Sequence, residues 1–345
     1  MSGPLILIGA SVRAAAESAR AAGFGPLCFD LFGDLDTRAA AAAWTRVPDF
    51  GAETLRRVLE LPPSPAVFTG AMESRPAFVD AVAARHAVWG ATDASLRGCR
   101  EPEAVQRAAA AAGLEPLGVS RVRPAGGRWV WKPLASAGGV DFDDPACGRP
   151  GFWQRRAEGR PASAFFLKGR LFGHAWQGGG AAADLWADRA RPGWADRLAG
   201  VVDALGLPGP VGVDVMVEVN GRPRVLEVNP RWTASVELIE RLTGRSAAAA
   251  LAGEWGLVRA AADAACVGKR VVFADAAAVV SVDVRGRFAA GRVADVPPAG
   301  AAVAAGEPLC TVFAEGADAD DVRAGLDTAA AEVRRGLSAC SGDAG

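Results

Sequence analysis

Residues 212–231 read GVDVMVEVNGRPRVLEVNPR, and this stretch decides the fold of the chain. Two apolar segments, 211–219 and 224–228, lie on either side of Asn220-Gly221. Asn-Gly between two apolar runs favours a tight type I′ turn, which joins antiparallel strands. The stretch therefore predicts a β-hairpin, the clearest one in the sequence.

Three polar side chains of this hairpin can share one face. Glu227 and Asn229 are two residues apart on the second strand and point the same way, and Asp214 lies on the antiparallel partner. Their hard oxygen ligands suit magnesium, and Arg231 follows where it can meet a phosphate. Any one of these residues alone reads as an ordinary strand charge. The set is more informative, because Glu227 interrupts an apolar strand in which an unpaired charge is costly.

The N-terminal part of the chain alternates strands and helices. An apolar run at 5–8, a helix at 13–22 and a strand at 26–30 predict parallel strands with helices on their faces. A further strand at 66–69 and helix at 77–85 extend this pattern. The fold class is therefore α/β, beginning with a Rossmann-like layer.

Beyond the first layer the sequence divides into further units. Helices are predicted at 101–112, 235–242 and 320–337, with short strands in between and strand-rich sequence after residue 268. The predicted units are a Rossmann-like domain at 1–92, a central domain at 93–260, a small strand-rich domain at 261–337 and a disordered tail at 338–345.

Composition excludes several classes of function. The 345 residues carry 38 Lys and Arg against 39 Asp and Glu, so no basic surface for nucleic acid is expected. Apolar runs are too short to span a membrane, which predicts a cytoplasmic protein without a membrane partner. Six scattered cysteines and two histidines argue against a disulfide framework or a zinc site. His174 is interpreted as structural, and Lys168 and Lys269 as solvated.

Candidate substrate ligands lie at the carboxyl edge of the predicted parallel sheet, where open α/β folds bind ligands. They are Ser11, Arg13, Asp30 and Glu73. Alternatives remain open for these residues, since Ser11 suits a helix N-cap, Arg13 a solvated position and Asp30 a polar loop. The turn after the first strand lacks the spaced glycines of a dinucleotide site, which excludes an NAD site.

Three motifs together resemble the ATP-grasp ligases. They are VLEVNPR at 225–231, Trp131-Lys132-Pro133 followed by Ser136-Ala137-Gly138-Gly139, and QRRAEGRPAS at 154–163. The resemblance implies a Rossmann-like front domain, a two-lobed nucleotide clamp and a small C-terminal domain, in that order.

The resemblance also implies roles for individual residues. Lys132 would contact the nucleotide phosphates, a loop with Ser136, Gly138 and Gly139 would fold over them, and the segment from Gln154 to Glu158 would meet adenine and ribose. Asp214, Glu227 and Asn229 would hold Mg²⁺, or alternatively Mn²⁺, and Arg231 would stabilise the transferred phosphoryl group. The family's earlier lysine is absent, and Arg100 is the substitute at that position.

The implied activity is an ATP- and Mg²⁺-dependent ligase that joins a small-molecule carboxylate to an amine through an acyl phosphate. The segments 9–37, 69–74 and 295–312 resemble a branch related to biotin carboxylase and associated with tetrahydromethanopterin-linked one-carbon metabolism. Two alternatives are a small-molecule kinase and a non-catalytic nucleotide-binding protein. The sequence leaves the oligomeric state open, a homodimer included.

Overall fold

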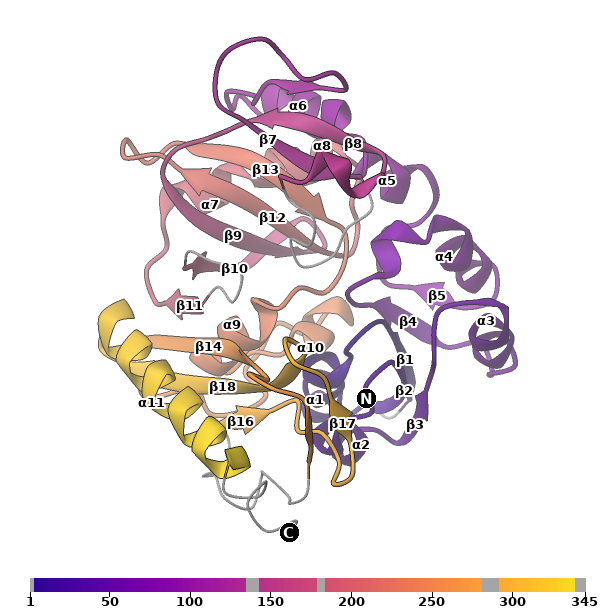
Figure 1. Cartoon of the computed structure of the whole chain (residues 1–345). Coiled ribbons are helices and arrows are strands. Elements are labelled where there is room, and N and C mark those ends of the chain that lie inside the picture. Colours follow the sequence, from indigo (N-terminus) through magenta and orange to yellow (C-terminus); the bar gives the residue numbers. More distant parts are fainter. Residues whose placement is uncertain (1–2, 135–142, 179–183, 281–291, 339–345) are drawn as a thin grey trace.

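The N-terminal unit is a parallel five-stranded sheet in the order β3-β2-β1-β4-β5 (Figure 1). The computed structural model describes residues 3–134, 143–178, 184–280 and 292–338. The strands of this sheet are β1 (Pro4–Ile8), β2 (Gly25–Asp30), β3 (Ala43–Arg46), β4 (Pro65–Phe68) and β5 (Ala87–Val88). The intervening helices are α1 (Arg13–Ala21), α2 (Leu35–Ala40), α3 (Ala52–Leu59), η1 (Met72–Ser74) and α4 (Pro76–Ala83).

Strand β1 shows why this layer forms. Leu5 and Leu7 belong to a buried cluster with the alanine face of α1, whereas Ile6 and Ile8 belong to a cluster with Val58 of α3 and residues of α4. A strand that is buried on both faces must be apolar at every position, as this one is. The predicted α/β class is confirmed.

A small lobe follows, with a three-stranded antiparallel sheet in the order β6-β8-β7. Its elements are α5 (Asp93–Gly98), α6 (Pro102–Ala111), β6 (Val119–Ser120), β7 (Trp129–Pro133), η2 (Pro145–Cys147) and β8 (Gly151–Arg155). Figure 1 shows β7 and β8 lying over the hairpin strands β12 and β13, so that the two sheets face each other. This arrangement places the Lys132 strand opposite the Glu227 strand.

The largest sheet is antiparallel and has the order β13-β12-β9-β10-β11-β14-β18-β16. Its first five strands in chain order are β9 (Arg160–Leu167), β10 (Arg170–Gln177), β11 (Leu185–Asp188), β12 (Pro210–Val217) and β13 (Pro223–Asn229). The helices of this part are α7 (Gly193–Arg197), α8 (Ala199–Ala204), α9 (Val236–Thr243) and α10 (Ala247–Leu251).

The turn of the predicted hairpin differs from the expected type I′. Gly221 has φ +78°, whereas Asn220 is not among the residues of positive φ that type I′ requires. The Glu218 amide donates to the Arg222 carbonyl, which closes a three-residue loop with glycine at its left-handed position. The hairpin prediction is therefore confirmed and the turn type was wrong.

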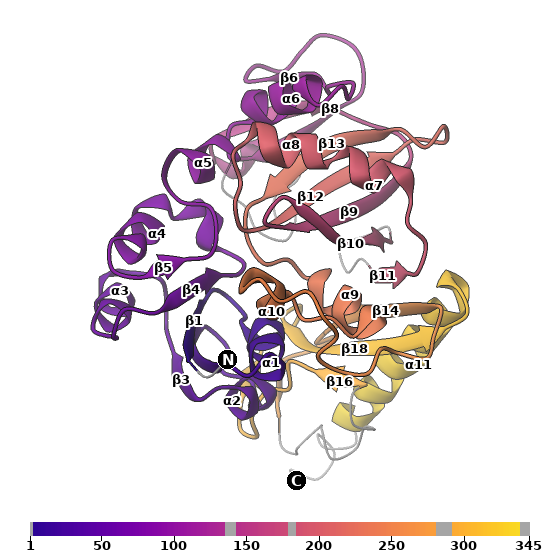
Figure 2. The same cartoon turned by 180° about the vertical axis from the view of Figure 1, so that it is seen from behind.

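The C-terminal strands continue the same sheet. They are β14 (Cys266–Phe273), β16 (Val293–Ala294) and β18 (Pro308–Gly316), with β15 (Ala278–Val279) and β17 (Ala302–Val303) paired separately. Helix α11 (Ala319–Ser338) packs along β14 and β18 (Figure 2). The large sheet therefore contains strands from both sides of the boundary predicted after residue 260. The domain boundaries after residues 92 and 260 remain predictions. Ser338 ends α11 rather than beginning the predicted tail, whose other residues lie outside the described ranges.

Helices of the described ranges lack the combination of length and apolarity that a membrane span requires.

A buried ionic network joins the N-terminal layer to the large sheet. Arg13 of α1 donates to Glu237 of α9 at 2.9 Å and to Asp295, after β16, at 3.0 Å. Lys269 of β14 donates to the same Glu237 at 3.2 Å. The prediction of a solvated Lys269 was wrong, because this side chain is 9% exposed and neutralises a buried carboxylate. We call Arg13, Glu237, Lys269 and Asp295 the Glu237 network.

A second buried carboxylate of α9 makes stability depend on pH. Glu240 accepts from Ser18 and from the Ala247 amide and pairs with Arg259 at 3.0 Å. Burial raises its pKa to about 7. The folded protein thus holds this proton more tightly than the unfolded chain, so the stability from this group is complete below its ordinary pKa and is lost as pH rises through about 7.

We expect Glu240→Gln to remove this pH dependence. As pH rises from about 4.5 to 8, the unfolding free energy of the variant should increase relative to that of wild type by on the order of 3 kcal/mol. The reason is that an amide has no proton to lose. Urea unfolding of both proteins across this range measures the difference. Glu254→Gln, at an exposed position, is the control. Parallel curves for wild type and Glu240→Gln would contradict the assignment.

Candidate functional site

The polar face predicted for the hairpin is present. Asp214 of β12 pairs directly across the ladder with Glu227 of β13. The Asn229 amide donates to Asp214 Oδ2 at 2.9 Å and to Glu227 Oε1 at 3.3 Å. The three side chains therefore form one cluster, as the two-residue period of a strand requires.

Lys132 reaches this cluster from the opposite sheet. Its Nζ lies 3.3 Å from Glu227 Oε2 and 3.4 Å from Gln154 Oε1, and its side chain is 9% exposed. Gln154 of β8 is held in turn by the Leu226 carbonyl at 3.0 Å. The lysine and glutamine of the small lobe thus bridge to β13 across the space between the two sheets.

The charges of this cluster are strongly coupled. Burial and the neighbouring Glu227 raise the pKa of Asp214 to about 8. Burial acts in the same direction on Glu227, but the Lys132 ammonium and the Asn229 amide outweigh it and lower the pKa of Glu227. Of the two adjacent carboxyl groups, Asp214 therefore holds a proton more readily, and Glu227 is the one that stays ionised.

This donor set fits a divalent cation. A hard cation would neutralise both carboxylates, and Asn229, whose amide N–H group now faces them, would turn its oxygen toward the ion. Among the described residues, no group of three or more His, Cys, Asp and Glu side chains could hold a metal by itself. Phosphate oxygens and water would therefore complete the coordination, as magnesium at phosphate sites usually requires.

Arg231 connects the cluster to the N-terminal layer. Its Nε lies 2.7 Å from Glu73 Oε1, and its Nη2 donates to Asn229 Oδ1 at 3.3 Å. Glu73 belongs to η1, directly after β4, and its side chain is 1% exposed. The Trp232 amide donates to the Phe68 carbonyl at 3.1 Å, which holds the two segments together. Glu73, a candidate substrate ligand, thus lies against the phosphoryl-site candidate Arg231.

A cavity of about 520 Å³ opens between the two sheets beside the cluster. Lys132, Gln154 and Glu158 line it, as do three apolar side chains that sequence reasoning missed: Val130, Met216 and Leu226. Met216 could have been predicted from the sequence, since it lies two residues from Asp214 on the same strand and so shares its face. Glu158 is 79% exposed and pairs with Arg128 at 2.6 Å. We call this space the inter-sheet cavity.

Arg100 is the one remaining nucleotide candidate that lies within the described residues. Arg100, which follows α5, donates to the carbonyl of Leu134, the last described residue of its segment. Ser136, Gly138 and Gly139 lie outside the described residues. Their predicted contacts with phosphate stay predictions, and so does that of Arg100.

The other substrate candidates have structural partners. Arg13 is 3% exposed and belongs to the Glu237 network, so it is not the solvated side chain that was one alternative. Asp30 is fully buried and accepts from the Gly33 amide at 3.0 Å and Trp44 Nε1 at 3.1 Å. Ser11 is half-buried, and the N-cap of α1 is Val12, so the N-cap alternative for Ser11 was wrong.

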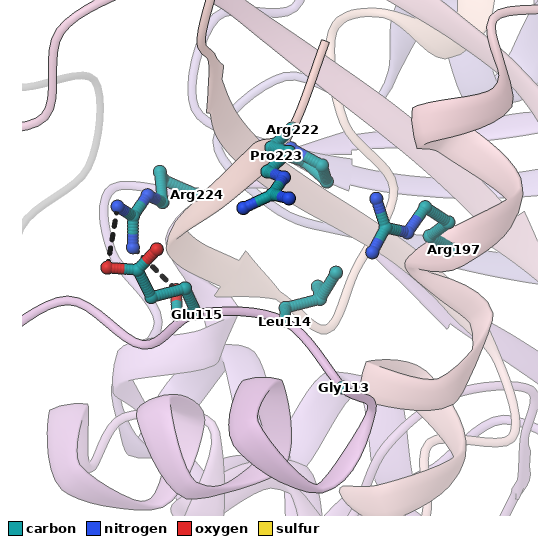
Figure 3. Close-up of a pocket in the computed structure, with 7 residues that line it drawn as sticks. All are labelled: Gly113, Leu114, Glu115, Arg197, Arg222, Pro223 and Arg224. Atoms are coloured by element: carbon teal, nitrogen blue, oxygen red, sulfur yellow. Dashed lines mark hydrogen bonds and ion pairs between the residues drawn. The ribbon is translucent and has the colours of Figure 1, made fainter. Parts of the chain in front are cut away.

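A separate cavity of about 310 Å³ lies where α6 and α7 end and β13 begins (Figure 3). Arg197 and Arg222 project into it from opposite sides, whereas Arg224 turns toward Glu115 and pairs with it at 2.8 Å. This cavity has no lining residue in common with the inter-sheet cavity. We call it the Arg197 pocket.

Comparison with known proteins agrees with this geometry. Residues 180–235 match the family model described as ATP-grasp domain. No curated protein matches the chain. L-amino acid ligase from Bacillus licheniformis is 16% identical, with a TM-score of 0.68 over 96% of this chain and 97% of that one.

Two further solved structures are similar. Biotin carboxylase from Campylobacter jejuni is 12% identical, with a TM-score of 0.70 over 97% of this chain and 95% of that one. Carboxyaminoimidazole ribonucleotide synthase from Aspergillus clavatus, complexed with ATP, is 11% identical, with a TM-score of 0.71 over 97% and 99%. Identities this low show a shared fold, so the chain has the fold of these ATP-grasp ligases and carboxylases.

Proposed function

We propose that this protein is an ATP- and Mg²⁺-dependent ligase that joins a small-molecule carboxylate to an amine through an acyl phosphate. One observation carries the proposal. Lys132, Asp214, Glu227, Asn229 and Arg231 come from two facing sheets and meet beside a cavity of about 520 Å³. A cation, two carboxylates, an amide and a guanidinium are the groups that phosphoryl transfer requires.

The inter-sheet cavity would receive the nucleotide. Lys132, which lines the cavity and pairs with Glu227 of the neighbouring cluster, would contact the phosphates. Val130, Met216 and Leu226 supply apolar walls for a purine base. The segment from Gln154 to Glu158 would meet the adenine and ribose, and the loop with Ser136, Gly138 and Gly139 would cover the phosphates, as the sequence resemblance implies.

Asp214, Glu227 and Asn229 would hold Mg²⁺, with Mn²⁺ as an alternative. When bound, the ion would neutralise charge on the phosphate oxygens and so favour phosphoryl transfer. The pairing of Lys132 with Glu227 and of Asn229 with both carboxylates keeps these groups in place before a ligand arrives.

The reaction has two displacements. A carboxylate oxygen of the first substrate attacks the γ-phosphorus of ATP, and the bond from that phosphorus to the bridging oxygen of ADP breaks. Arg231 stabilises the charge on the transferred group. The amine then attacks the acyl carbon, inorganic phosphate leaves, and the amine loses a proton, which gives an amide. Since positioning and charge stabilisation dominate such transfers, no nucleophilic side chain is needed.

The substrates would lie near Glu73, because this residue brings the N-terminal layer to Arg231. Ser11 and the other edge residues would lie farther from the reacting groups. Glutamate, other amino acids and a pterin are the first substrates to screen, the last because of the sequence resemblance to a one-carbon branch. A homodimer is the oligomeric state to examine first.

We expect ADP release from ATP and Mg²⁺ to depend on a matched carboxylate and amine. Lys132→Ala should lower the rate of ADP formation at least about a hundredfold, since it removes the cation beside the phosphates. Lys168→Ala is the matched control, because this exposed lysine lies in the turn between β9 and β10. Mass spectrometry of the product distinguishes an amide from a phosphate ester.

Two outcomes would contradict the ligase. A phosphate ester with no amide would favour the kinase alternative. ATP binding without turnover for any pair, together with equal ATP affinity of the Lys132→Ala and Lys168→Ala variants, would contradict both the catalytic proposal and the placement of the phosphates.

A further inference from the structure

A third cavity, of about 250 Å³, lies between β10, α9 and the segment 188–192. Its apolar wall consists of Leu171, Ala187, Pro192, Ile239 and Leu242. Helix α9 approaches β10 closely at Gly173, where a Cβ atom would lie 2.6 Å from Ile239. We call this cavity the β10–α9 pocket. It has no lining residue in common with the inter-sheet cavity or the Arg197 pocket.

Three arginines line the β10–α9 pocket: Arg245 is half-buried, and Arg189 and Arg191 are exposed. Arg245 donates to the Phe172 carbonyl at 2.5 Å and lies over the Phe172 ring. Arg189 donates to the carbonyls of Ala262 at 2.7 Å and Ala264 at 3.1 Å. Within the described ranges, neither guanidinium is paired with a carboxylate. Main-chain carbonyls, and for Arg245 also the face of the Phe172 ring, are the groups that offset these charges.

The setting of Arg245 is unfavourable for a charge. The side chain is half-buried, and burial together with Arg170 and Arg191 lowers its pKa. Among the described residues, most half-buried arginines have a carboxylate partner, as Arg224 has in Glu115 and Glu218. An isolated cation in such a place is costly unless an anion compensates it.

Acidic groups near the pocket are already engaged. Asp188, the one carboxylate of the lining, accepts from Trp176 Nε1 at 3.0 Å and from the Ala190 amide at 2.9 Å, and lies 3.4 Å from His174 Nε2. Asp196 pairs with Arg191 at 2.9 Å on the exposed rim. Within the described ranges, neither carboxylate pairs with Arg189 or Arg245.

We propose that the β10–α9 pocket binds a small organic acid, with its carboxylate on Arg245 and its apolar body against Ile239 and Leu242. Guanidinium groups recognise carboxylates with two parallel hydrogen bonds. Ligand sites typically combine apolar walls with a few placed polar groups, and a cavity of about 250 Å³ favours a compact ligand. The proposal is independent of the proposed ligase activity.

The test uses 3-phenylpropionate and its neutral analogue 3-phenylpropionamide as probes. Titration of methyl-labelled protein by NMR should shift the methyl signals of Ile239 and Leu242 with the acid. The amide should bind at least about tenfold more weakly, since it cannot form the charged pair. Arg245→Gln should weaken binding of the acid by a similar factor.

Several variants locate the effect. Arg189→Gln removes a second positive charge of the lining, so it should also weaken binding of the acid, and it serves if Arg245→Gln does not fold. Arg197→Gln removes an arginine of the Arg197 pocket and Lys132→Ala removes the cation of the inter-sheet cavity, so both should leave the affinity unchanged. Equal binding of acid and amide, loss of binding in Arg197→Gln or Lys132→Ala, or no methyl shift with either probe would overturn the proposal.

Discussion

Glu227→Gln should reduce ADP formation at least about a hundredfold while the protein stays folded. The substitution keeps the shape of the side chain and its contact with the Asn229 amide, but it removes the charge that pairs with Lys132. Asp214 would then be the one carboxylate left for the divalent ion. Because the two carboxylates together neutralise that ion, we expect weaker Mg²⁺ binding as well as slower turnover.

Initial rates of ADP release at increasing Mg²⁺ separate the two effects. A shift of the Mg²⁺ dependence to higher concentration indicates loss of a ligand, and a lower plateau indicates loss of charge stabilisation. Circular dichroism and thermal unfolding verify the fold, and Glu254→Gln is the control at an exposed position. Unchanged turnover at low Mg²⁺ would contradict the metal assignment.

The largest loss of stability is expected from Glu237→Gln, on the order of 3–5 kcal/mol of unfolding free energy. Glu237 is 4% exposed and neutralises both Arg13 and Lys269, which are themselves buried. Removing its charge takes from Lys269 the carboxylate that pairs with it and leaves Arg13 with Asp295 and Glu17 as hydrogen-bonded partners. This loss of unfolding free energy should be far greater than the contribution of a solvent-exposed ion pair.

Urea unfolding of wild type and variant measures this difference. Arg56→Ala is the matched control, because Arg56 is 56% exposed and pairs with Glu53 and Glu60 on the surface of α3. Surface ion pairs contribute about 0–1 kcal/mol, so the control should change little. A Glu237→Gln midpoint equal to that of Arg56→Ala would show that the Glu237 network does not stabilise the fold.

Much of the candidate site could be predicted because its residues are close in sequence or in strand register. Glu227 and Asn229 follow from the two-residue period of one strand, and Asp214 follows from the antiparallel partner. Lys132 required the family resemblance, because no local pattern relates it to β13. Met216 could have been found by the same period, whereas Val130 and Leu226 depend on how the two sheets face each other.

Contacts between distant segments could not be predicted. From the sequence, Lys269 is expected to be solvated and Arg13 to bind substrate or to be solvated, because the sequence does not show that Glu237 lies between them. Arg231 pairs with Glu73 although the two residues lie far apart in the sequence. The three-residue loop at Gly221 also escaped prediction, since Asn-Gly is compatible with more than one turn.

The sequence by itself determined the α/β class, the parallel N-terminal layer and the polar face of the 212–231 hairpin. These features depend on periods of two and 3.6 residues, which are local properties of the chain. Only the tertiary structure decided which charges are buried together, how the C-terminal strands extend the large sheet, and that Arg245 donates to the Phe172 carbonyl. The energy of a buried charge depends on its neighbours in space, and only the folded chain brings those neighbours together.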